Sequence, residues 1–379
     1  MARVKLKDVI IRVNTKVDKD NTDLIYYVGG EHVESENIRV EKRGLIAGST
    51  IGPMFYYGFK AGDFLLVSRN PHLKKAGLVD FDGICSEKTF VLATANPEVL
   101  LPEFLPFTLQ NDRFWEYAYK NRHGSTNTFI NWSTLSNYEF DLPDLDTQYK
   151  LAKILWSINN TREAYKKLIT ATDELVKSQF VVQFGEADYS PYEVSTIGKE
   201  CILKSGTTFT PDKEQSAEAF LYAKVADMNL PGNEVYITTS STFVSEETAG
   251  KTFIEKGAVI FPKRGGAIGT NKKRILCRDT CVDLNIMGVI PGKRIKTEYL
   301  YVYFLRMDLA SICDGSTIPQ LNNKNVSPLR IIVPPIDQQE RFVTFFRQSD
   351  KSKFLALIRA NLNLSSALAY PEQIRLNGG

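Results

Sequence analysis

The stretch Gly124–Lys150, GSTNTFINWSTLSNYEFDLPDLDTQYK, returns later in the chain as Gly315–Arg341, GSTIPQLNNKNVSPLRIIVPPIDQQER. Placed over each other without a gap, the two segments lie 191 residues apart and agree at eight of 27 positions. Unrelated residues of ordinary composition agree at roughly one position in twenty. The identical residues are Gly124-Ser125-Thr126 with Gly315-Ser316-Thr317, Asn131 with Asn322, Ser136 with Ser327, Pro143 with Pro334, Asp146 with Asp337 and Gln148 with Gln339. The sequence therefore predicts a tandem duplication.

Upstream of this block the similarity is looser but keeps its order. The run Lys60–Asp63, followed by apolar residues and Arg69, resembles Glu255–Ala258, followed by apolar residues and Arg264. A cysteine comes next in each half. Chance similarity between two mixed domains is the alternative interpretation, but the shared order favours a repeat.

Each half has the same order of features. A mixed region of about 140 residues has short β-branched and aromatic runs broken by Gly, Pro and Asn, which is typical of a compact α+β domain. These runs are Phe64–Val67, Phe90–Leu92, Ala258–Phe261 and Ile331–Val333. A long helical pattern follows each region, over about 146–180 and 337–369. We therefore expect two tandem α+β domains, 1–143 and 184–333, and two long helices, within 144–183 and 334–379.

Both helices are expected to begin with the same chemistry. Asp337 follows two prolines and has Glu340 three residues on, which predicts an N-cap and a capping box. Asp146 is the counterpart in the first half, where Tyr149 stands in place of the glutamate. Only the cap is expected there.

Each helical stretch carries an apolar seam in steps of three and four residues. The first seam is Leu151, Ile154, Ile158, Tyr165, Leu168, Thr172 and Leu175, and the second is Phe342, Phe345, Phe346, Leu355, Ile358, Leu362 and Leu368. These patterns run nearly three times the mean helix length of about 12 residues, which favours antiparallel pairing of the two helices with each other. At 1.5 Å per residue, a helix of about 34 residues is roughly 50 Å long. Two DNA-reading domains at its ends would be separated by somewhat more than one turn of B-DNA, which is about 34 Å.

Composition narrows the class of protein. With 379 residues we expect two to three domains, and 43% hydrophobic residues with a net charge of +3 exclude a disordered or collagen-like chain. The five cysteines are odd in number and thinly spread, so we expect reduced thiols in a cytoplasmic protein. No apolar run reaches the roughly 18 residues of a membrane span. The three histidines stand alone, so no metal site is expected.

The basic residues gather in one stretch of the second half. Lys251–Arg278 contains eight Lys and Arg residues and a single acid, Glu255. Within it, a strand is followed by a glycine-rich loop whose backbone could come close to a phosphate. Arg264 could bind a guanine edge or a phosphate. The candidate contacts here are Lys263, Arg264, Gly265, Gly266, Lys272 and Lys273. A surface hairpin with solvated charges is the alternative.

Three further places are candidates for DNA contact. The first-half counterpart of the loop offers Arg69, Lys74 and Lys75 but fewer glycines. A second loop offers a lysine and hydroxyls suited to phosphate, where a plain polar turn is the alternative. Its candidates are Lys204, Ser205 and Thr207. Lys324, beside the repeated Gly-Ser-Thr, is the third place.

A signature of catalysis is missing from the sequence. An amino-methyltransferase needs Asn or Asp before Pro-Pro-Tyr or Pro-Pro-Phe, but Val333 precedes the two prolines here and Ile336 follows them. The sequence contains no nucleotide-binding G-x-x-x-x-G-K-[ST] motif. No nucleophile, base and orienting group are suggested together. We therefore expect no catalysis by this chain alone.

The whole chain resembles the specificity subunits of type I restriction-modification enzymes. The most specific marks of the resemblance are Gly315–Asn322 (GSTIPQLN), Pro334–Gln339 (PPIDQQ) and the long helix after each domain. The first half departs from the pattern at Thr128–Asn131 (TFIN), whereas the second half keeps it at Ile318–Leu321 (IPQL).

The resemblance implies a division of labour. In that family each variable domain is a target recognition domain that reads one half of a bipartite site in double-stranded DNA. The paired helices act as a spacer and as a dock for two methyltransferase subunits, which two restriction/translocase subunits can join. S-adenosylmethionine, ATP and magnesium would then lie on partner subunits, with no cofactor on this chain.

Two other functions remain open at this point. One is a helical scaffold that binds protein or small ligands, which predicts no salt-dependent DNA binding. The other is a self-contained enzyme that cuts or methylates DNA, which requires the catalytic motifs that are missing.

Overall fold

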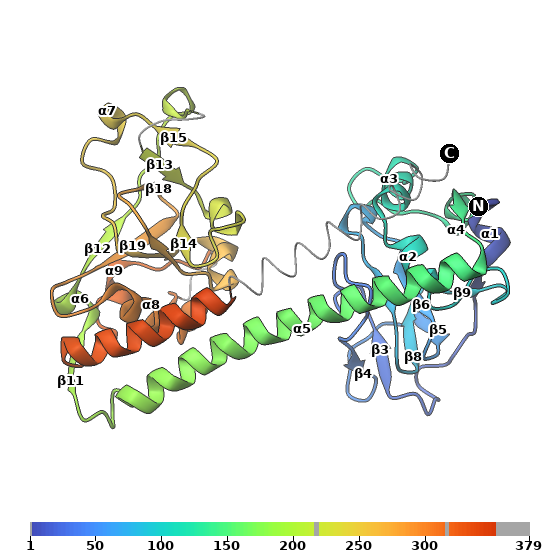
Figure 1. The fold of residues 1–379 in the computed structure, drawn as a ribbon, viewed down its shortest axis with the longest axis horizontal. Coiled ribbons are helices and arrows are strands. Elements are labelled where there is room, and N and C mark those ends of the chain that lie inside the picture. The colour runs from blue at the N-terminus through green and yellow to red at the C-terminus, as the bar shows by residue number, and fades with distance from the viewer. Residues whose placement is uncertain (1, 216–219, 315–317, 354–379) are drawn as a thin grey trace. The chain divides into compact units, whose positions relative to one another are not determined.

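The structure is a computed structural model and describes residues 2–215, 220–314 and 318–353. It divides into two compact units, and the division falls inside one long helix, between Glu163 and Ala164. Each unit combines short helices with small sheets (Figure 1), which confirms the expected α+β class.

The first unit, unit 1, is built of short elements that lead into the long helix α5. In chain order these are β1 (Ala2–Lys5), α1 (Leu6–Val9), β2 (Ile10–Val13), β3 (Tyr26–Val28), β4 (Gly44–Leu45), β5 (Phe55–Phe59), β6 (Phe64–Val67), η1 (Pro71–Leu73), β7 (Ala76–Leu78), β8 (Gly83–Ser86), β9 (Thr89–Thr94), α2 (Leu105–Leu109), α3 (Asp112–Lys120), α4 (Trp132–Leu135), β10 (Glu139–Leu142) and α5 (Leu145–Phe184). The strands form a two-stranded ladder, β1-β10, and two four-stranded sheets, β2-β9-β6-β7 and β4-β3-β8-β5.

Strand β6 connects the two halves of the unit 1 core. All four of its residues, Phe-Leu-Leu-Val, are buried, and successive side chains of a strand point to opposite faces of the sheet. Phe64 and Leu66 join a cluster with residues of α2 and α3, whereas Leu65 and Val67 pack with residues of the second sheet. An unbroken apolar run is thus required, because the strand is covered on both faces.

The second unit, unit 2, has the same kind of parts. They are β11 (Glu193–Thr196), α6 (Ile197–Glu200), β12 (Cys201–Ser205), η2 (Pro211–Lys213), β13 (Phe220–Ala223), η3 (Val225–Asn229), β14 (Tyr236–Ile237), β15 (Phe243–Val244), α7 (Glu246–Ala249), β16 (Val259–Pro262), η4 (Gly265–Thr270), β17 (Arg274–Leu276), β18 (Cys281–Val282), β19 (Ile286–Pro291), α8 (Thr297–Leu305), η5 (Leu309–Ile312), α9 (Asn323–Val326), β20 (Arg330–Val333) and a helix over 336–353. The sheets are β11-β20, β12-β19-β16-β17-β14 and β15-β13-β18. Strand β16 repeats the role of β6, because Val259 and Phe261 pack with α8 while Ile260 packs with a separate cluster.

The expected tandem repeat is confirmed element by element. Five elements of unit 1 have a counterpart in unit 2 that begins 191 residues later. The pairs are β1 with β11, α1 with α6, β2 with β12, α4 with α9 and β10 with β20. Between them the offset changes to 195 for β6 and β16 and to 197 for β9 and β19. Small insertions therefore explain why the upstream sequence match is looser.

A two-stranded ladder closes each unit. In unit 1, β1 pairs antiparallel with β10, so that Ala2 lies opposite Leu142 and Lys5 opposite Glu139. In unit 2, β11 pairs with β20 in the same way. The first and last strands of each unit are thus fastened to each other directly before a long helix begins.

One buried glutamine per unit fixes the start of that helix. Gln148 and Gln339 are both 0% exposed, and each accepts one backbone N–H and donates to two backbone carbonyls. The bonds join Gln148 to the Leu101 amide (2.9 Å) and to the Val99 (2.9 Å) and Pro143 (2.8 Å) carbonyls, and Gln339 to the Lys296 amide (2.9 Å) and to the Arg294 (2.8 Å) and Pro334 (2.8 Å) carbonyls. These two residues are among the eight identities of the repeated stretch.

The helix starts differ from the sequence prediction. The side chain that caps α5 is Asp144, whose Oδ1 accepts the Thr147 amide at 2.9 Å. Asp146 instead forms an ion pair with Lys150 one turn later. Each helix begins one residue before the predicted aspartate, at Leu145 and at position 336. The predicted caps at Asp146 and Asp337 are therefore wrong.

Within unit 2, the second half of α5 packs against the 336–353 helix. The rings of Phe180 and Phe184 each lie 5.5 Å from the ring of Phe342, and Lys353 Nζ lies 2.6 Å from Asp173 Oδ1. The later α5 residue, Phe180, contacts the earlier residue Phe342, and the earlier α5 residue, Asp173, contacts the later residue Lys353. The two helices therefore run antiparallel, as predicted.

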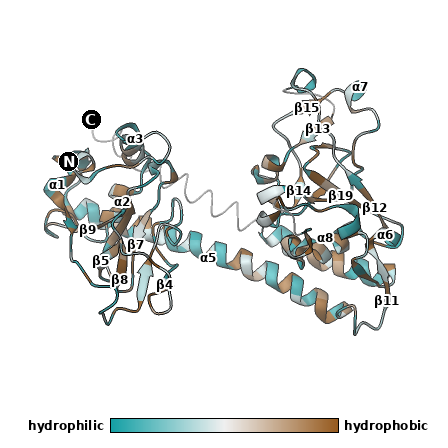
Figure 2. Cartoon of the chain, turned by 180° about the vertical axis from the view of Figure 1, so that it is seen from behind, coloured by the Kyte–Doolittle hydropathy of each residue, from teal (hydrophilic) through white to brown (hydrophobic). Residues whose placement is uncertain are grey.

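The predicted seam is correct for the described part of the second helix and wrong for part of α5. Phe342 and Phe346 are buried and Phe345 is partly buried. On α5, however, Leu168 and Leu175 are 52% and 53% exposed. Hydrophobic and hydrophilic residues alternate along the whole of α5 (Figure 2). Its buried apolar positions are Ala152, Val176, Phe180 and Phe184.

The buried face of α5 is shifted by one residue from the predicted seam, which corresponds to a rotation of about 100° around the helix axis. Other predicted seam residues of α5 are partly buried, namely Leu151, Ile158, Tyr165 and Thr172, whereas Ile154 is exposed. Leu355, Ile358, Leu362 and Leu368 lie outside the described residues.

Candidate nucleic-acid interface

The two units present one arginine each at equivalent places. Arg69 and Arg264 each lie two residues after the end of a buried strand, β6 or β16, and both are exposed. The backbone of Arg69 bridges to Phe129, and that of Arg264 bridges to Gln320. Because strand and bridge hold the backbone on both sides, each unit fixes the base of its arginine and leaves the guanidinium at the surface.

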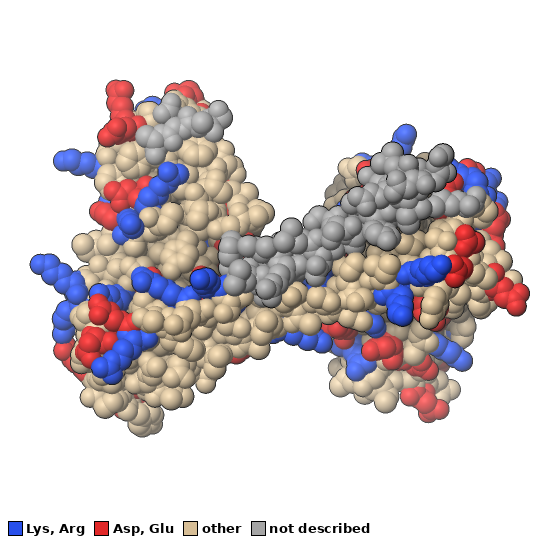
Figure 3. Space-filling view, in the orientation of Figure 1, with Lys and Arg blue, Asp and Glu red and all other residues tan. Residues whose placement is uncertain are grey.

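Charges of both signs are interspersed on the visible face of each unit (Figure 3). The net charge of +3 is likewise small. A polyanion would therefore be held by local groups of cations, since sequence-independent phosphate binding depends on nearby Lys and Arg.

In unit 2, the cation beside Arg264 is Lys263, which directly follows β16 and contacts the end of β12. Lys263 Nζ donates to Ser205 Oγ at 2.8 Å, so two predicted contact residues are brought together. Burial, and secondarily the charge of Arg264, lower the pKa of Lys263. An anion placed beside this pair would favour the ammonium form and offset the repulsion.

The rest of the predicted Lys204 loop is tied to its own unit. Lys204 Nζ donates to the Phe253 carbonyl at 2.5 Å and pairs with Glu255 at 3.3 Å. The Thr207 amide donates to the Val282 carbonyl at 2.9 Å, and its side chain is partly exposed. Lys204 is thus held by internal partners, whereas Ser205 remains at the surface.

The prediction for Lys273 is wrong. Its side chain is 1% exposed, and its ammonium donates to Asn271 Oδ1 at 2.6 Å and to the Met307 carbonyl at 2.7 Å. Burial lowers the pKa of Lys273 to about 8. The residue supports the loop from inside, because Asn271 ends η4 in the left-handed conformation at φ +53°.

The other predicted residues near this loop are spread more widely. Gly265 and Gly266 lie at the start of η4, and Lys272 Nζ forms a hydrogen bond with Asn229 Oδ1. Lys324 is exposed on α9. The repeated Gly315-Ser316-Thr317 lies outside the described residues.

In unit 1, two of the three predicted cations are already neutralised or anchored. Lys74 Nζ lies 2.8 Å from Glu36 Oε1 and 2.9 Å from Asp112 Oδ1, and these hydrogen bonds raise the pKa of Lys74. Lys75 Nζ donates to the Gly30 carbonyl at 2.6 Å. Arg69 is the exposed cation of the three.

Sequence reasoning missed the aromatic and basic neighbours of Arg69. The Tyr56 hydroxyl donates to Glu87 at 3.4 Å, and Glu87 also pairs with Lys88. The hydrogen bond from Lys88, with a smaller contribution from Arg69, lowers the pKa of Glu87. Lys16 Nζ lies 5.9 Å from the centre of the Tyr56 ring. These residues come from separate strands and turns, so no local sequence pattern predicts that they lie near Arg69.

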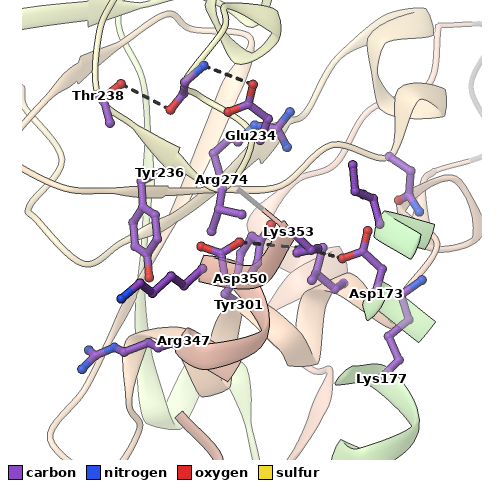
Figure 4. A pocket seen from close by; sticks show the side chains of 16 residues that line it. Asp173, Lys177, Glu234, Tyr236, Thr238, Arg274, Tyr301, Arg347, Asp350 and Lys353 are labelled. Carbon is purple, nitrogen blue, oxygen red and sulfur yellow. Dashed lines mark hydrogen bonds and ion pairs between the residues drawn. The ribbon is translucent and has the colours of Figure 1, made fainter. Parts of the chain in front are cut away.

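Unit 2 also contains a cavity of about 700 Å³ between α5, β14, α8 and the 336–353 helix (Figure 4). Lys353 bridges two carboxylates in its wall, Asp173 Oδ1 at 2.6 Å and Asp350 Oδ1 at 3.7 Å. Burial raises the pKa of Asp350. The Lys353–Asp173 ion pair thus joins the two helices at this wall.

Metal and membrane sites have no support in the described ranges. Among residues 2–215, 220–314 and 318–353, no three His, Cys, Asp or Glu side chains are grouped so that they could hold a metal ion. The five cysteines are free thiols. None of the helices that the structure describes is long and apolar enough to cross a membrane.

Comparisons with known proteins agree on one family. The family model for the type I restriction modification DNA specificity domain matches residues 189–363. The chain is similar to the MjaIX specificity subunit of a type I restriction enzyme from Methanocaldococcus jannaschii, with 23% identity over 369 residues, covering 86% of this chain and 77% of that protein.

Two solved structures share the fold along nearly the whole chain. The S subunit of a type I restriction-modification system from M. genitalium aligns with a TM-score of 0.55 at 15% identity, covering 97% of this chain and 93% of that one. A chain from a type I R-M system, solved to explain complex assembly and conformational transition, aligns with a TM-score of 0.52 at 18% identity, covering 97% and 95%.

Proposed function

We propose that the chain is a specificity subunit of a type I restriction-modification system, and that each of its two units reads one part of a bipartite DNA site. Specific reading would come from a few side chains in a groove of the duplex, while Lys and Arg contacts to phosphates position the unit. Catalysis would belong to other subunits.

The observation that supports this proposal best is the equivalence of Arg69 and Arg264. Each follows the central buried strand of its unit, and each is bridged to the segment that precedes α4 or α9. Two copies of one DNA-reading unit in a single chain would recognise two separate sequences, and a duplication explains why their frames match while their loops differ.

The partners follow from the same premise. We propose that two methyltransferase subunits dock along the long helices and supply S-adenosylmethionine chemistry, and that two restriction/translocase subunits using ATP and magnesium can join them. Support comes from α5, whose Leu168, Leu175 and Val182 are 52%, 53% and 75% exposed and recur every seven residues. A repeat of seven is the spacing of a helix-packing seam.

The test is methylation mapping at single-base resolution. DNA is taken from cells that express this chain with a candidate methyltransferase subunit, and from cells that express that subunit alone. A two-part methylated motif with a fixed gap, present only in the first sample, supports the proposed function.

The contrary result is equally clear. A soluble complex of the two proteins that produces no new methylated motif would refute the DNA-reading role. It would favour the scaffold function, in which the helices assemble partners and the units bind no DNA.

A further inference from the structure

A second cavity, of about 470 Å³, lies beside Arg264 in unit 2. We call it the η4 cavity, because glycines of η4 form one wall and η5 and the following residues form the other. Its lining consists of Gly265, Gly266, Ile268, Gly269, Ala310, Cys313, Asp314 and Pro319.

Two of these glycines are not required by the protein itself. Gly265 adopts φ +65°, a left-handed conformation in which glycine is favoured. Gly266 and Gly269 have no such φ, and a Cβ added at either would meet no atom within 4 Å. Neither backbone conformation nor packing explains glycine there, whereas close approach of a ligand to the backbone does.

The neighbourhood of the cavity is basic on the side of β16. Arg264 is exposed and precedes the cavity wall directly, and the Gly265 amide donates to the Pro319 carbonyl at 2.8 Å within that wall. The acid in the lining, Asp314, accepts the Gln320 amide with Oδ1 at 3.0 Å. An anion beside Arg264 would therefore find a cation and exposed backbone rather than a row of carboxylates.

The lining also indicates which part of a nucleic acid fits. Among the lining residues that the structure describes, none has an aromatic side chain on which a base could stack. Glycine walls instead let a backbone come close, which is how proteins approach phosphates. The shape and chemistry favour the sugar–phosphate chain over a flipped base.

We infer that the η4 cavity receives the sugar–phosphate backbone of one DNA strand, and that Arg264 contacts the neighbouring part of the same strand. This inference rests on the proposed function and deepens it, because it assigns a phosphodiester to one place in unit 2. The counterpart in unit 1, η1, has Pro71, His72 and Leu73 in place of the glycines, so the two units hold their strands differently.

Cys313 provides a direct test, since its partly exposed thiol lines the cavity. The full complex with its methyltransferase subunits is treated with a maleimide at mildly alkaline pH, with and without the duplex found by methylation mapping, and labelling is measured by mass spectrometry. Duplex should slow labelling of Cys313 at least tenfold. Cys277, also partly exposed but outside the cavity lining, is the internal control and should not change.

A second test adds a methyl group to the cavity wall. Gly266→Ala and Gly269→Ala should each weaken duplex binding by roughly tenfold or more without changing thermal unfolding. Gly52→Ala is the matched control, because Gly52 in unit 1 is also free of positive φ and open around its Cβ. The duplex is also scanned with single neutral methylphosphonates. The linkage whose neutralisation weakens the wild type most should cause little further loss in Gly266→Ala.

The outcomes separate the two proposals. Equal affinity of Gly266→Ala, Gly269→Ala and Gly52→Ala, together with unprotected Cys313 in a wild-type complex that binds the duplex, refutes the η4 assignment alone. A wild-type complex that binds no duplex and methylates no bipartite site refutes the proposed function. Protection of Cys313 without any effect of methylphosphonates would show that a base edge, not the backbone, occupies the cavity, which overturns the assignment as well.

Discussion

Lys273 shows how the surroundings of a side chain decide its role. In the sequence it stands in a run of three cations, Lys272–Arg274, which is typical of a solvated or DNA-contacting surface. In the structure its ammonium is enclosed and donates to an amide oxygen and a carbonyl. Charge patterning predicted that the region is basic, but it could not tell which lysine turns inward, because β16, β17 and the loop after α8 meet only in three dimensions.

The buried Lys273 predicts an alkaline rise in stability. Its pKa falls from 10.5 to about 8 on folding, so between these values the unfolded chain binds a proton that the folded chain has released. The free energy of unfolding of the wild type relative to Lys273→Met should therefore increase with pH across this window, by up to about 1.4 kcal/mol per pH unit. Denaturant unfolding of the wild type and Lys273→Met at several pH values measures this. A difference between the two that does not change with pH would contradict it.

The two anchoring glutamines make a paired prediction. Gln339→Ala leaves the Lys296 amide and two carbonyls inside the protein without their partner, which should cost about 2–4 kcal/mol of unfolding free energy. Gln148→Ala should cost a similar amount through its three equivalent bonds. Gln338→Ala, one position away and partly exposed, should cost less than about 1 kcal/mol in the same chemical denaturation. Equal losses for Gln338 and Gln339 would show that the anchor is unimportant.

The two arginines should control different parts of the DNA site. Arg264→Ala should weaken binding of the full complex by about 1–3 kcal/mol and relax its preference in one half-site only, whereas Arg69→Ala should affect the other half-site. Arg278→Ala is the control, because Arg278 lies near the opposite end of β16 from Arg264. Its neighbour Asp279 accepts a hydrogen bond from the Lys256 amide, shortly before β16 begins. Affinities and salt slopes from titrations of labelled duplexes decide. Unchanged affinity for both variants would remove the arginines from the site.

At the scale of elements, the long helix shows what periodicity can and cannot predict. Steps of three and four residues correctly indicated a helix near 146–180, and the structure extends it to Leu145–Phe184. The same steps are satisfied by two neighbouring faces, and the pattern favoured the Leu168–Leu175 face. The buried face at Val176, Phe180 and Phe184 is chosen by the aromatic partners Tyr299 and Phe342, which lie far away in the sequence.

Two substitutions on α5 distinguish these faces. Phe180→Ala removes a side chain that is 1% exposed and contacts the rings of Tyr299 and Phe342, so we expect a loss of about 3–5 kcal/mol in unfolding free energy. Leu175→Ala, at 53% exposure, should cost less than about 1 kcal/mol. The isolated chain is the right sample, because partner subunits would cover Leu175. Equal losses would restore the predicted seam.

At the scale of the whole molecule, the repeat was the most predictable feature and the site the least. Eight identities sufficed to predict two α+β units, because the shared residues include the glutamines and prolines that fix each helix start. Arg264 could be proposed as a contact because a glycine-rich loop follows a strand in the sequence. Tyr56, Lys88 and Lys16 were missed because three separate segments of unit 1 bring them together.

The division of the chain inside α5 leads to a prediction about spacing. Seven residues of helix add about 10 Å, close to the rise of three base pairs. Inserting a heptad into α5 between Glu163 and Ala164, and a matching heptad after Lys353, should lengthen the gap of the recognised site by about three base pairs and leave both half-sites unchanged. Methylation mapping reads the gap directly. An unchanged gap would refute the spacer role of the helices.

The ladders that close each unit also bear on how such proteins can change through evolution. Since β1 is fastened to β10 and β11 to β20, everything between the two strands of a ladder enters and leaves the fold at one place. A recombination event that exchanges this interior for a related one, with the same backbone groups to bond the glutamine, would leave the ladder and the helix in position. Under the proposed function, a single exchange would change the DNA preference of one unit and leave the helix surfaces that bind partner subunits unchanged.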